Sequence, residues 1–221
     1  MSPSPTDTAA DRFSIADVVG VVADRQTYKN VLYLILAFPL GLAYYMLLVF
    51  GFAFGLALSV LVVGLGILLG TVIGLRVIAS FERGLANALL GTDIPAAEDV
   101  EATDDGVVAT AKAYLQAAST WRGLGFVVLK FWIGIVSFVL LVSLLGTAIE
   151  LLLLPLFPAG VFEVQVAGWT VAGSFTTPLG RAVAVPIGAV LAVVACHVLN
   201  AFARVNASIA SSLLGGHQPA E

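Results

Sequence analysis

Three ionisable side chains, Lys130, Glu150 and His197, lie within long apolar stretches of the sequence. Burying a charge at the centre of a lipid bilayer costs about 2.5–3.5 kcal/mol for Lys or Asp, so each residue is a functional hypothesis by default. Lys130 follows Arg122 by about two helical turns, near enough to a membrane surface for its stem to snorkel. Glu150 is expected near the other end of the same helix, within reach of water. Interface anchoring is the structural alternative for both.

His197 and Asn200 lie one helical turn apart in the last apolar stretch, at roughly the depth expected for Lys130. These side chains are predicted to form a polar cluster near the inner membrane surface. A neutral histidine that is hydrogen-bonded between helices is the structural alternative to a proton or ligand site. Glu163 and Trp169 lie between the last two apolar stretches, where we expect an external signal to act.

The sequence lacks the motifs that indicate catalysis or a bound cofactor. It has no Walker loop, no dinucleotide fingerprint after a strand and no His-Glu-x-x-His, and a single cysteine, Cys196, excludes a thiolate metal cluster. A histidine kinase would need a long soluble ATP-binding domain, for which these residues leave no room. We therefore predict no catalytic residue, no metal site, no cofactor and no direct binding of nucleic acid.

The composition indicates which elements must carry these residues. Hydrophobic residues make up 60% of the 221 residues and charged residues 11%, against roughly 45–50% and about 25% in soluble domains. The uncharged stretch between Lys29 and Arg76 is long enough for two helical crossings of about 20 residues each. We predict an all-α membrane protein with four transmembrane spans, at residues 31–50, 55–75, 124–154 and 182–203.

The distribution of lysine and arginine predicts the orientation in the plasma membrane. Basic residues beside the spans mark the cytoplasmic side, and of those that flank the spans only Arg181 lies at the opposite ends. Both termini are therefore expected in the cytoplasm. On the outer side, Gly51–Gly55 is predicted to form a short turn. The longer outer segment 155–180 contains an alternating stretch, Val161–Gly173, which predicts a small extracytoplasmic β-hairpin.

The regions between the spans divide the chain. Residues 1–12 are predicted to be a disordered tail, followed by a first unit at 13–91 that opens with a short interfacial helix and ends with a cytoplasmic helix. Residues 92–106 carry six acidic residues and no basic one, which predicts a solvated cytoplasmic linker. A second unit follows at 107–215, with a cytoplasmic helix at each end, and a tail at 216–221. The sequence pI of about 5.1 suits a halophilic archaeon as host.

The two units look like internal repeats. The stretch Thr27–Gly41 aligns without a gap with Thr120–Gly134, at a constant offset of 93, and shares a threonine, aromatic and basic residues, a leucine and a glycine with it. Phe81-Glu-Arg83 has an echo in Phe202-Ala-Arg204. Two spans separate the copies, so both start on the same side of the membrane, which predicts parallel repeats related by an axis near the membrane normal. Chance alignment of two apolar helices is the alternative.

One helix of each unit carries a stripe of small residues, which lets membrane helices approach closely. The stripes consist of Gly66, Gly70 and Gly74 in the second span and of Ala184, Gly188, Ala192 and Cys196 in the fourth. We predict that the second span packs against the fourth. Dimerisation through the same stripes, which would give a homo-oligomer, is the competing use.

Several of these runs resemble a known family. The run Thr27–Gly41, Phe81-Glu-Arg83, Leu89-Leu-Gly91, Thr120-Trp-Arg122 and His197-Val-Leu-Asn200 are similar to those of the prokaryotic "putative sensor" domain family, over about residues 20–215. The resemblance implies a four-helix membrane sensor, found ahead of a histidine kinase core in bacteria and as a stand-alone protein in archaea. The kinase is missing here, so the stand-alone version is expected. Phe131-Trp132 departs from the expected Phe-Pro, and the family offers no catalytic residue to carry over.

We therefore expect a membrane-embedded sensor or signalling module without its own kinase. An outer signal or a change in the lipid bilayer would shift the packing of the spans, and a separate cytoplasmic regulator or kinase would receive the signal. A small transporter or channel component is the first alternative, because of the parallel repeats and the intramembrane Lys130, Glu150 and His197. A structural membrane protein that assembles with others is the second.

Overall fold

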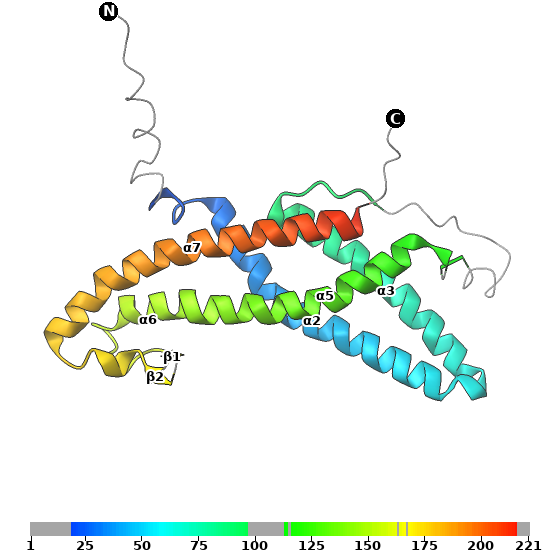
Figure 1. Cartoon of the computed structure of the whole chain (residues 1–221), viewed down its shortest axis with the longest axis horizontal. Helices are drawn as coiled ribbons and strands as arrows, with labels where there is room; N and C mark the ends of the chain where they lie inside the picture. The colour runs from blue at the N-terminus through cyan, green and yellow to red at the C-terminus, as the bar shows by residue number, and fades with distance from the viewer. Residues whose placement is uncertain (1–18, 97–112, 115, 163, 167, 216–221) are drawn as a thin grey trace, which may run out of the picture. The chain divides into compact units, whose positions relative to one another are not determined.

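The computed structural model describes residues 19–96, 113–114, 116–162, 164–166 and 168–215. The start of the predicted interfacial helix, most of the predicted linker, both predicted tails and Glu163 lie outside these residues. The described residues are mostly helical (Figure 1), which confirms the predicted α-helical class.

Four long helical stretches make up most of the described chain. In chain order the elements are α2 (Arg25–Ala57), η2 (Ser59–Leu61), α3 (Val63–Leu90), α5 (Ala118–Leu140), η3 (Leu141–Gly146), α6 (Thr147–Leu153), β1 (Gln165–Val166), β2 (Trp169–Thr170), η4 (Ala172–Ser174) and α7 (Pro178–Leu214). The π-helical η3 continues α5 into α6. The stretches α2, α3, α5–α6 and α7 are long and apolar enough to cross a membrane, which confirms the prediction of four such helices.

The chain divides into two compact units. We call residues 1–28 and 140–201 the first compact unit, and residues 29–139 and 202–221 the second compact unit. The second compact unit contains two clusters of buried apolar side chains, one around Phe126 and one around Tyr44. In the first compact unit, Leu151 of α6 and Ala184 of α7 belong to one buried cluster. Each unit therefore has an apolar core of its own.

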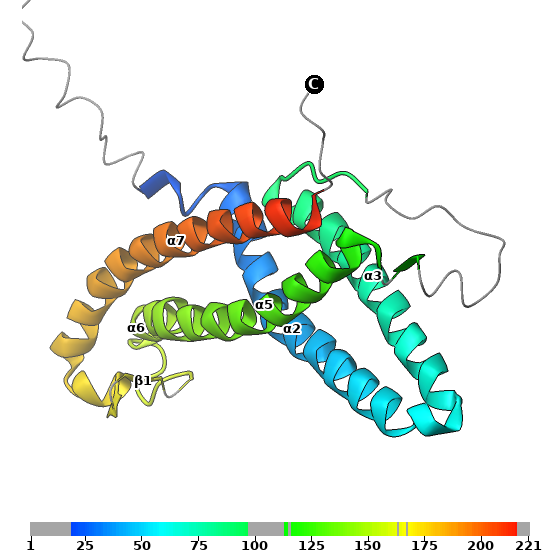
Figure 2. The same ribbon diagram turned by 45° about the vertical axis from the view of Figure 1, so that its right-hand side comes forward.

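The connection between α2 and α3 does not lie at Gly51–Gly55, the predicted site of a turn. α2 continues through both glycines to Ala57, and the chain turns only at residues 58–62. The prediction is wrong because glycine in a membrane helix also permits close packing. A Cβ added at Gly55 would lie 2.6 Å from the Leu68 side chain of α3. In Figures 1 and 2 the two helices converge towards this turn.

Two spanning helices extend beyond their predicted inner ends at residues 75 and 203. α3 continues to Leu90 and α7 to Leu214, without a break. The segments predicted as separate cytoplasmic helices after these spans are therefore continuations of them. Gly91 ends α3 in the left-handed conformation, with a φ of +68°, which fits its predicted role as a C-cap.

The start of the predicted solvated linker folds back on α3. Asn87 Oδ1 accepts hydrogen bonds from Thr92 Oγ1 (2.8 Å) and from the backbone N–H of Ile94 (2.9 Å). Asn87 Nδ2 donates to the Ile94 carbonyl (3.2 Å), and Ile94 is buried in the cluster around Phe126. Ile94 is therefore packed rather than solvated, because burial of its apolar side chain is favourable, whereas Asp93 is exposed.

The segment between α6 and α7 contains an antiparallel pair of two-residue strands. Gln165 of β1 lies opposite Thr170 of β2, and Val166 lies opposite Trp169. Gly168 between them has a φ of +84°, a conformation that glycine adopts without steric cost. The pair falls within the alternating stretch noted in the sequence. That this segment is extracytoplasmic stays a prediction.

The two small-residue stripes differ in their contacts. A Cβ added at Gly188 of α7 would lie 2.9 Å from the Leu151 Cβ and 3.1 Å from the Ala148 carbonyl oxygen, so α7 packs closely on α6. No atom of the described chain lies within 4 Å of a Cβ added at Gly66 or Gly70. Packing of the second span against the fourth through these stripes stays a prediction.

Candidate functional site

α2 and α5 cross at two glycines, Gly41 and Gly134. A Cβ added at Gly41 would lie 2.7 Å from the Lys130 carbonyl oxygen, and one at Gly134 would lie 2.6 Å from the Ala37 carbonyl oxygen. The obstructing atoms belong to the backbone and cannot rotate aside, so both positions require glycine. Gly41 and Gly134 differ by 93 in number, and so do Ala37 and Lys130. The same contact is thus made twice, with the two helices exchanged.

Two stacked aromatic pairs beside the crossing show the same exchange of corresponding residues between α2 and α5. Phe38 stacks on Phe138 with ring centroids 4.8 Å apart, and Tyr45 stacks on Phe131 with centroids 4.4 Å apart. At the offset of 93, Phe38 corresponds to Phe131 and Tyr45 corresponds to Phe138. Reciprocal contacts of this kind are what a two-fold axis between two equivalent helices produces.

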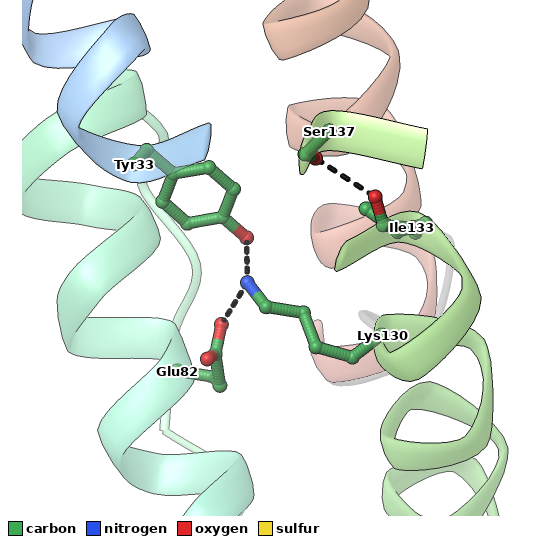
Figure 3. A network of polar contacts seen from close by, with 5 residues as sticks. All are labelled: Tyr33, Glu82, Lys130, Ile133 and Ser137. Carbon is green, nitrogen blue, oxygen red and sulfur yellow. Dashed lines mark hydrogen bonds and ion pairs between the residues drawn. The ribbon is translucent and has the colours of Figure 1, made fainter. Parts of the chain in front are cut away.

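The Lys130 side chain forms a polar network with Glu82 of α3 and Tyr33 of α2 (Figure 3). Its Nζ lies 2.8 Å from Glu82 Oε2 and donates a 2.8 Å hydrogen bond to the Tyr33 hydroxyl. The Nζ also lies 4.0 Å from the centroid of the Tyr33 ring and 5.9 Å from that of Phe126, within the range of cation–π attraction. One ammonium group therefore connects three helices.

The ion pair is enclosed by protein. The side chains of Lys130 and Glu82 are 1% and 0% exposed, and Tyr33 is 1% exposed. Removing two charges from water costs several kcal/mol per ion, and the attraction between them offsets this cost only when the geometry is good. The short contacts around Lys130 meet that condition.

Two buried oxygens next to the ion pair lack a hydrogen-bond partner. They are Glu82 Oε1 and the Tyr44 hydroxyl. Tyr44 lies near enough to Glu82 for an electrostatic interaction. An unpaired buried polar atom costs about 1–3 kcal/mol. The two unpaired oxygens therefore reduce the net stability of the network.

The predicted snorkelling of Lys130 is wrong, because its ammonium group is enclosed and paired. The predicted site does not include Glu82 or Tyr33. Glu82 lies in the segment for which the sequence predicts a cytoplasmic helix. The sequence does contain a signal for Glu82, which appears when the helical periodicity is continued past Arg76. The buried residues of α3 recur at this spacing: Leu75, Ile78, Ala79, Glu82 and Ala86.

Glu150 holds the segment that follows α6. Its Oε2 accepts hydrogen bonds from the backbone N–H groups of Val161 (3.0 Å) and Phe162 (2.9 Å). The side chain is 0% exposed, so the predicted access of water is wrong. Gly160, with a φ of +90°, lies against the carboxylate, where an added Cβ would collide with Oε1. These contacts give Glu150 a structural role, because it anchors a loop to a helix.

We expect Glu150→Ala to release residues 160–162 from α6, since both N–H groups lose their acceptor. Hydrogen exchange of the Val161 and Phe162 amides measures this, and their exchange should accelerate by about tenfold or more, as the loss of hydrogen bonds to a charged group implies. Glu150→Gln keeps an acceptor oxygen and serves as the matched control. Equal protection in the alanine and glutamine variants would contradict the anchoring role.

The remaining predicted site residues lie outside the network. The partners of Lys130 are Glu82 and Tyr33, whereas His197 and Asn200 belong to the other compact unit. His197 and Trp169 have exposed side chains, and Trp169 is 76% exposed. Asn200 Nδ2 donates a 2.7 Å hydrogen bond to Thr27 Oγ1 near the start of α2. A role for these residues in sensing stays a prediction.

Basic residues at equivalent positions bind near the C-terminal ends of two helices. Lys29 Nζ lies 3.5 Å from the Ala88 carbonyl oxygen near the end of α3, and Arg122 Nη1 donates a 3.0 Å hydrogen bond to the Gly215 carbonyl after α7. Lys29 and Arg122 differ by 93 in number. A basic side chain here offsets the partial negative charge of the helix end. Each predicted copy thus secures the end of its own second helix.

The network pairs one cation with one carboxylate. Among the residues that the structure describes, no three His, Cys, Asp or Glu side chains gather as metal ligands would. The desolvation cost of the ion pair and its attraction are large and nearly equal. The net contribution of the pair to stability is therefore small compared with either of these opposing effects.

Comparison with known proteins adds independent information. The family model described as "Putative sensor" matches residues 5–214 of the chain. No curated protein and no solved structure matches the chain. The matched range contains Tyr33, Glu82 and Lys130.

Proposed function

We propose that this chain, which belongs to the Putative sensor family, is a membrane-embedded sensor module that passes an outer or lipid-phase signal to a separate cytoplasmic partner. The proposal depends on one observation, the buried contact of Lys130 with Glu82 and Tyr33 across α2, α3 and α5. A sensor needs an element with two states whose equilibrium the signal biases. An ion pair between spanning helices is such an element, since it is either closed or open.

The crossing at Gly41 and Gly134 provides a pivot for this change. Its contacts are backbone against backbone, so the two helices can rotate about the crossing while the close approach is kept. Lys130 belongs to the crossing through its carbonyl oxygen and to the ion pair through its side chain. A small rotation of α2 against α5 therefore changes the Lys130–Glu82 separation directly.

The proposed topology has two parallel two-span repeats with both termini in the cytoplasm. The reciprocal contacts at the offset of 93 support the repeats, and so does the burial of Thr27 and Thr120, which are 2% and 5% exposed. The positive-inside rule supports the orientation, because Lys29 and Arg122 lie at the same end of their copies. A reporter fused at Asp99 that was found outside the cell would overturn it.

Deleting the chain is expected to change the host's transcriptional response to a membrane perturbation such as an osmotic shift or a bilayer-fluidising alcohol. RNA sequencing would compare wild type, the deletion strain and a strain with Lys130→Met and Glu82→Met together. The double variant keeps an apolar, packed site but cannot open or close an ion pair. We expect its response to be fixed, either permanently on or permanently off. An unchanged response in the deletion strain would refute the proposal.

The transporter alternative makes a different prediction. Transport sites lie in cavities near the bilayer midplane, whereas the Lys130 ammonium is enclosed and already neutralised by Glu82. Substrate or ion flux in proteoliposomes that disappears in the same double variant would favour transport over sensing. Homo-oligomerisation stays a prediction that the exposed Gly66 and Gly70 make testable by cross-linking.

A further inference from the structure

A cavity lies beside the start of α7, in the unit formed by residues 1–28 and 140–201. Its volume is about 380 Å3, within the range of about 300–1,000 Å3 that is typical of small-ligand sites. Apolar and polar side chains both line it: Pro158, Ala159, Thr170, Ala172, Gly173, Thr176 and Arg181. A Cβ added at Gly173 would lie 2.5 Å from Thr170 Oγ1, so this wall of the cavity has no room for a side chain.

The Arg181 side chain is held at the edge of this cavity by contacts that use only some of its N–H donors. Its Nε lies 3.4 Å from the Phe175 carbonyl oxygen, and its Nη2 donates a 3.1 Å hydrogen bond to the Thr176 carbonyl. Guanidinium has five N–H donors in a rigid fork. The described contacts use two of them and include no carboxylate, so the guanidinium is oriented by carbonyl groups and not by an ion pair with any described residue.

The position of Arg181 in the helix is unfavourable without an anion. It lies in the first turn of α7, where the helix dipole is positive and a basic residue is destabilising. The first turn contains no acidic residue that would offset it. The guanidinium and the cavity therefore form a positively charged recess with apolar walls.

We infer that this cavity binds an oxyanion of the phosphate type through the Arg181 guanidinium, with Thr170 and Thr176 as further hydrogen-bonding groups. Arginine binds such groups through paired, charge-assisted hydrogen bonds. Arg181 is the basic residue on the predicted outer side, so the inference deepens the proposed function by naming the chemistry of its outer signal, and it rests on that proposal. The anion comes either from a free solute or from a lipid headgroup at the membrane surface.

Two binding measurements on the full chain in maltoside micelles separate these sources. The first follows line broadening in the phosphorus NMR spectrum of inorganic phosphate. The second counts retained phosphatidylglycerol by native mass spectrometry. Both use wild type, Arg181→Gln, and the control Arg204→Gln, which removes the same charge from the distant end of α7.

We expect Arg181→Gln to reduce the specific signal at least threefold in one of the two measurements and Arg204→Gln to leave it unchanged. A loss in the phosphate measurement identifies a free anion, and a loss in the lipid measurement identifies a headgroup. Equal signals from wild type and Arg181→Gln in both measurements would overturn the inference. Because purified protein is used, such a failure is distinct from an unchanged transcriptional response, which would refute the sensor function alone.

Discussion

Lys130→Met is expected to lower the free energy of unfolding by about 3–5 kcal/mol, because it leaves the Glu82 carboxylate buried without its cation. Glu82 is 0% exposed, and one of its oxygens already lacks a hydrogen-bond partner. Titration with sodium dodecyl sulfate in mixed micelles, followed by circular dichroism, would measure this loss. It is the largest effect that we expect from a single substitution in this chain.

A double substitution separates the ion pair from the general packing of the site. Lys130→Met with Glu82→Met replaces both charges by apolar groups of similar length, and such replacements are often neutral or stabilising. We expect the double variant to recover most of the stability lost in Lys130→Met. Tyr33→Phe removes one hydrogen bond to a charged group and should cost about 1.5–3 kcal/mol. Additive losses from Lys130→Met and Glu82→Met would show that the two side chains do not interact.

Gly134→Ala is expected to destabilise the chain by about 1–3 kcal/mol, the usual cost of overpacking. The new Cβ would lie 2.6 Å from the Ala37 carbonyl oxygen and 2.9 Å from the Phe38 Cα, so the helices must separate. Gly41→Ala should have a similar effect, because its Cβ would lie 2.7 Å from the Lys130 carbonyl oxygen. The same titration measures both variants.

For the matched control, the expected change in stability has the opposite sign. Gly125 lies on α5 as Gly134 does, but apart from the nearby backbone of α5 itself and the two neighbouring residues no described atom lies within 4 Å of a Cβ added there. Gly125→Ala should therefore be neutral or stabilising by up to about 1 kcal/mol, since alanine favours a helix over glycine. A loss of stability in Gly125→Ala as large as that in Gly134→Ala would show that the crossing has no special packing.

The sequence predicts the existence of the four long helices well, because continuous apolar composition alone determines it. It predicts their ends less well. Gly51 and Gly55 look like a turn in the sequence, whereas in the structure they allow α3 to approach α2. The chemical character of glycine is the same in both roles, so only the neighbouring helix distinguishes them.

The candidate site is predicted only in part for a related reason. Lys130 is recognisable because it interrupts an apolar run, whereas Glu82 lies between Phe81 and Arg83 and looks like an interfacial residue. The burial of Glu82 depends on where α2 and α5 pack. The periodicity of buried residues on α3 indicates this packing but does not establish it. Glu150 shows the same limit, since its partners are backbone N–H groups that no sequence motif reveals.

The reciprocal crossing has a consequence for how the two halves can diverge. In the predicted repeat alignment, the positions that correspond to Lys130, Tyr33 and Glu82 carry the buried residues Ala37, Phe126 and Ala203. Two identical two-span subunits would have to carry a lysine at both places or at neither. A single chain is free of that symmetry, so one predicted repeat can carry the charged contact while the other carries apolar residues at the corresponding positions.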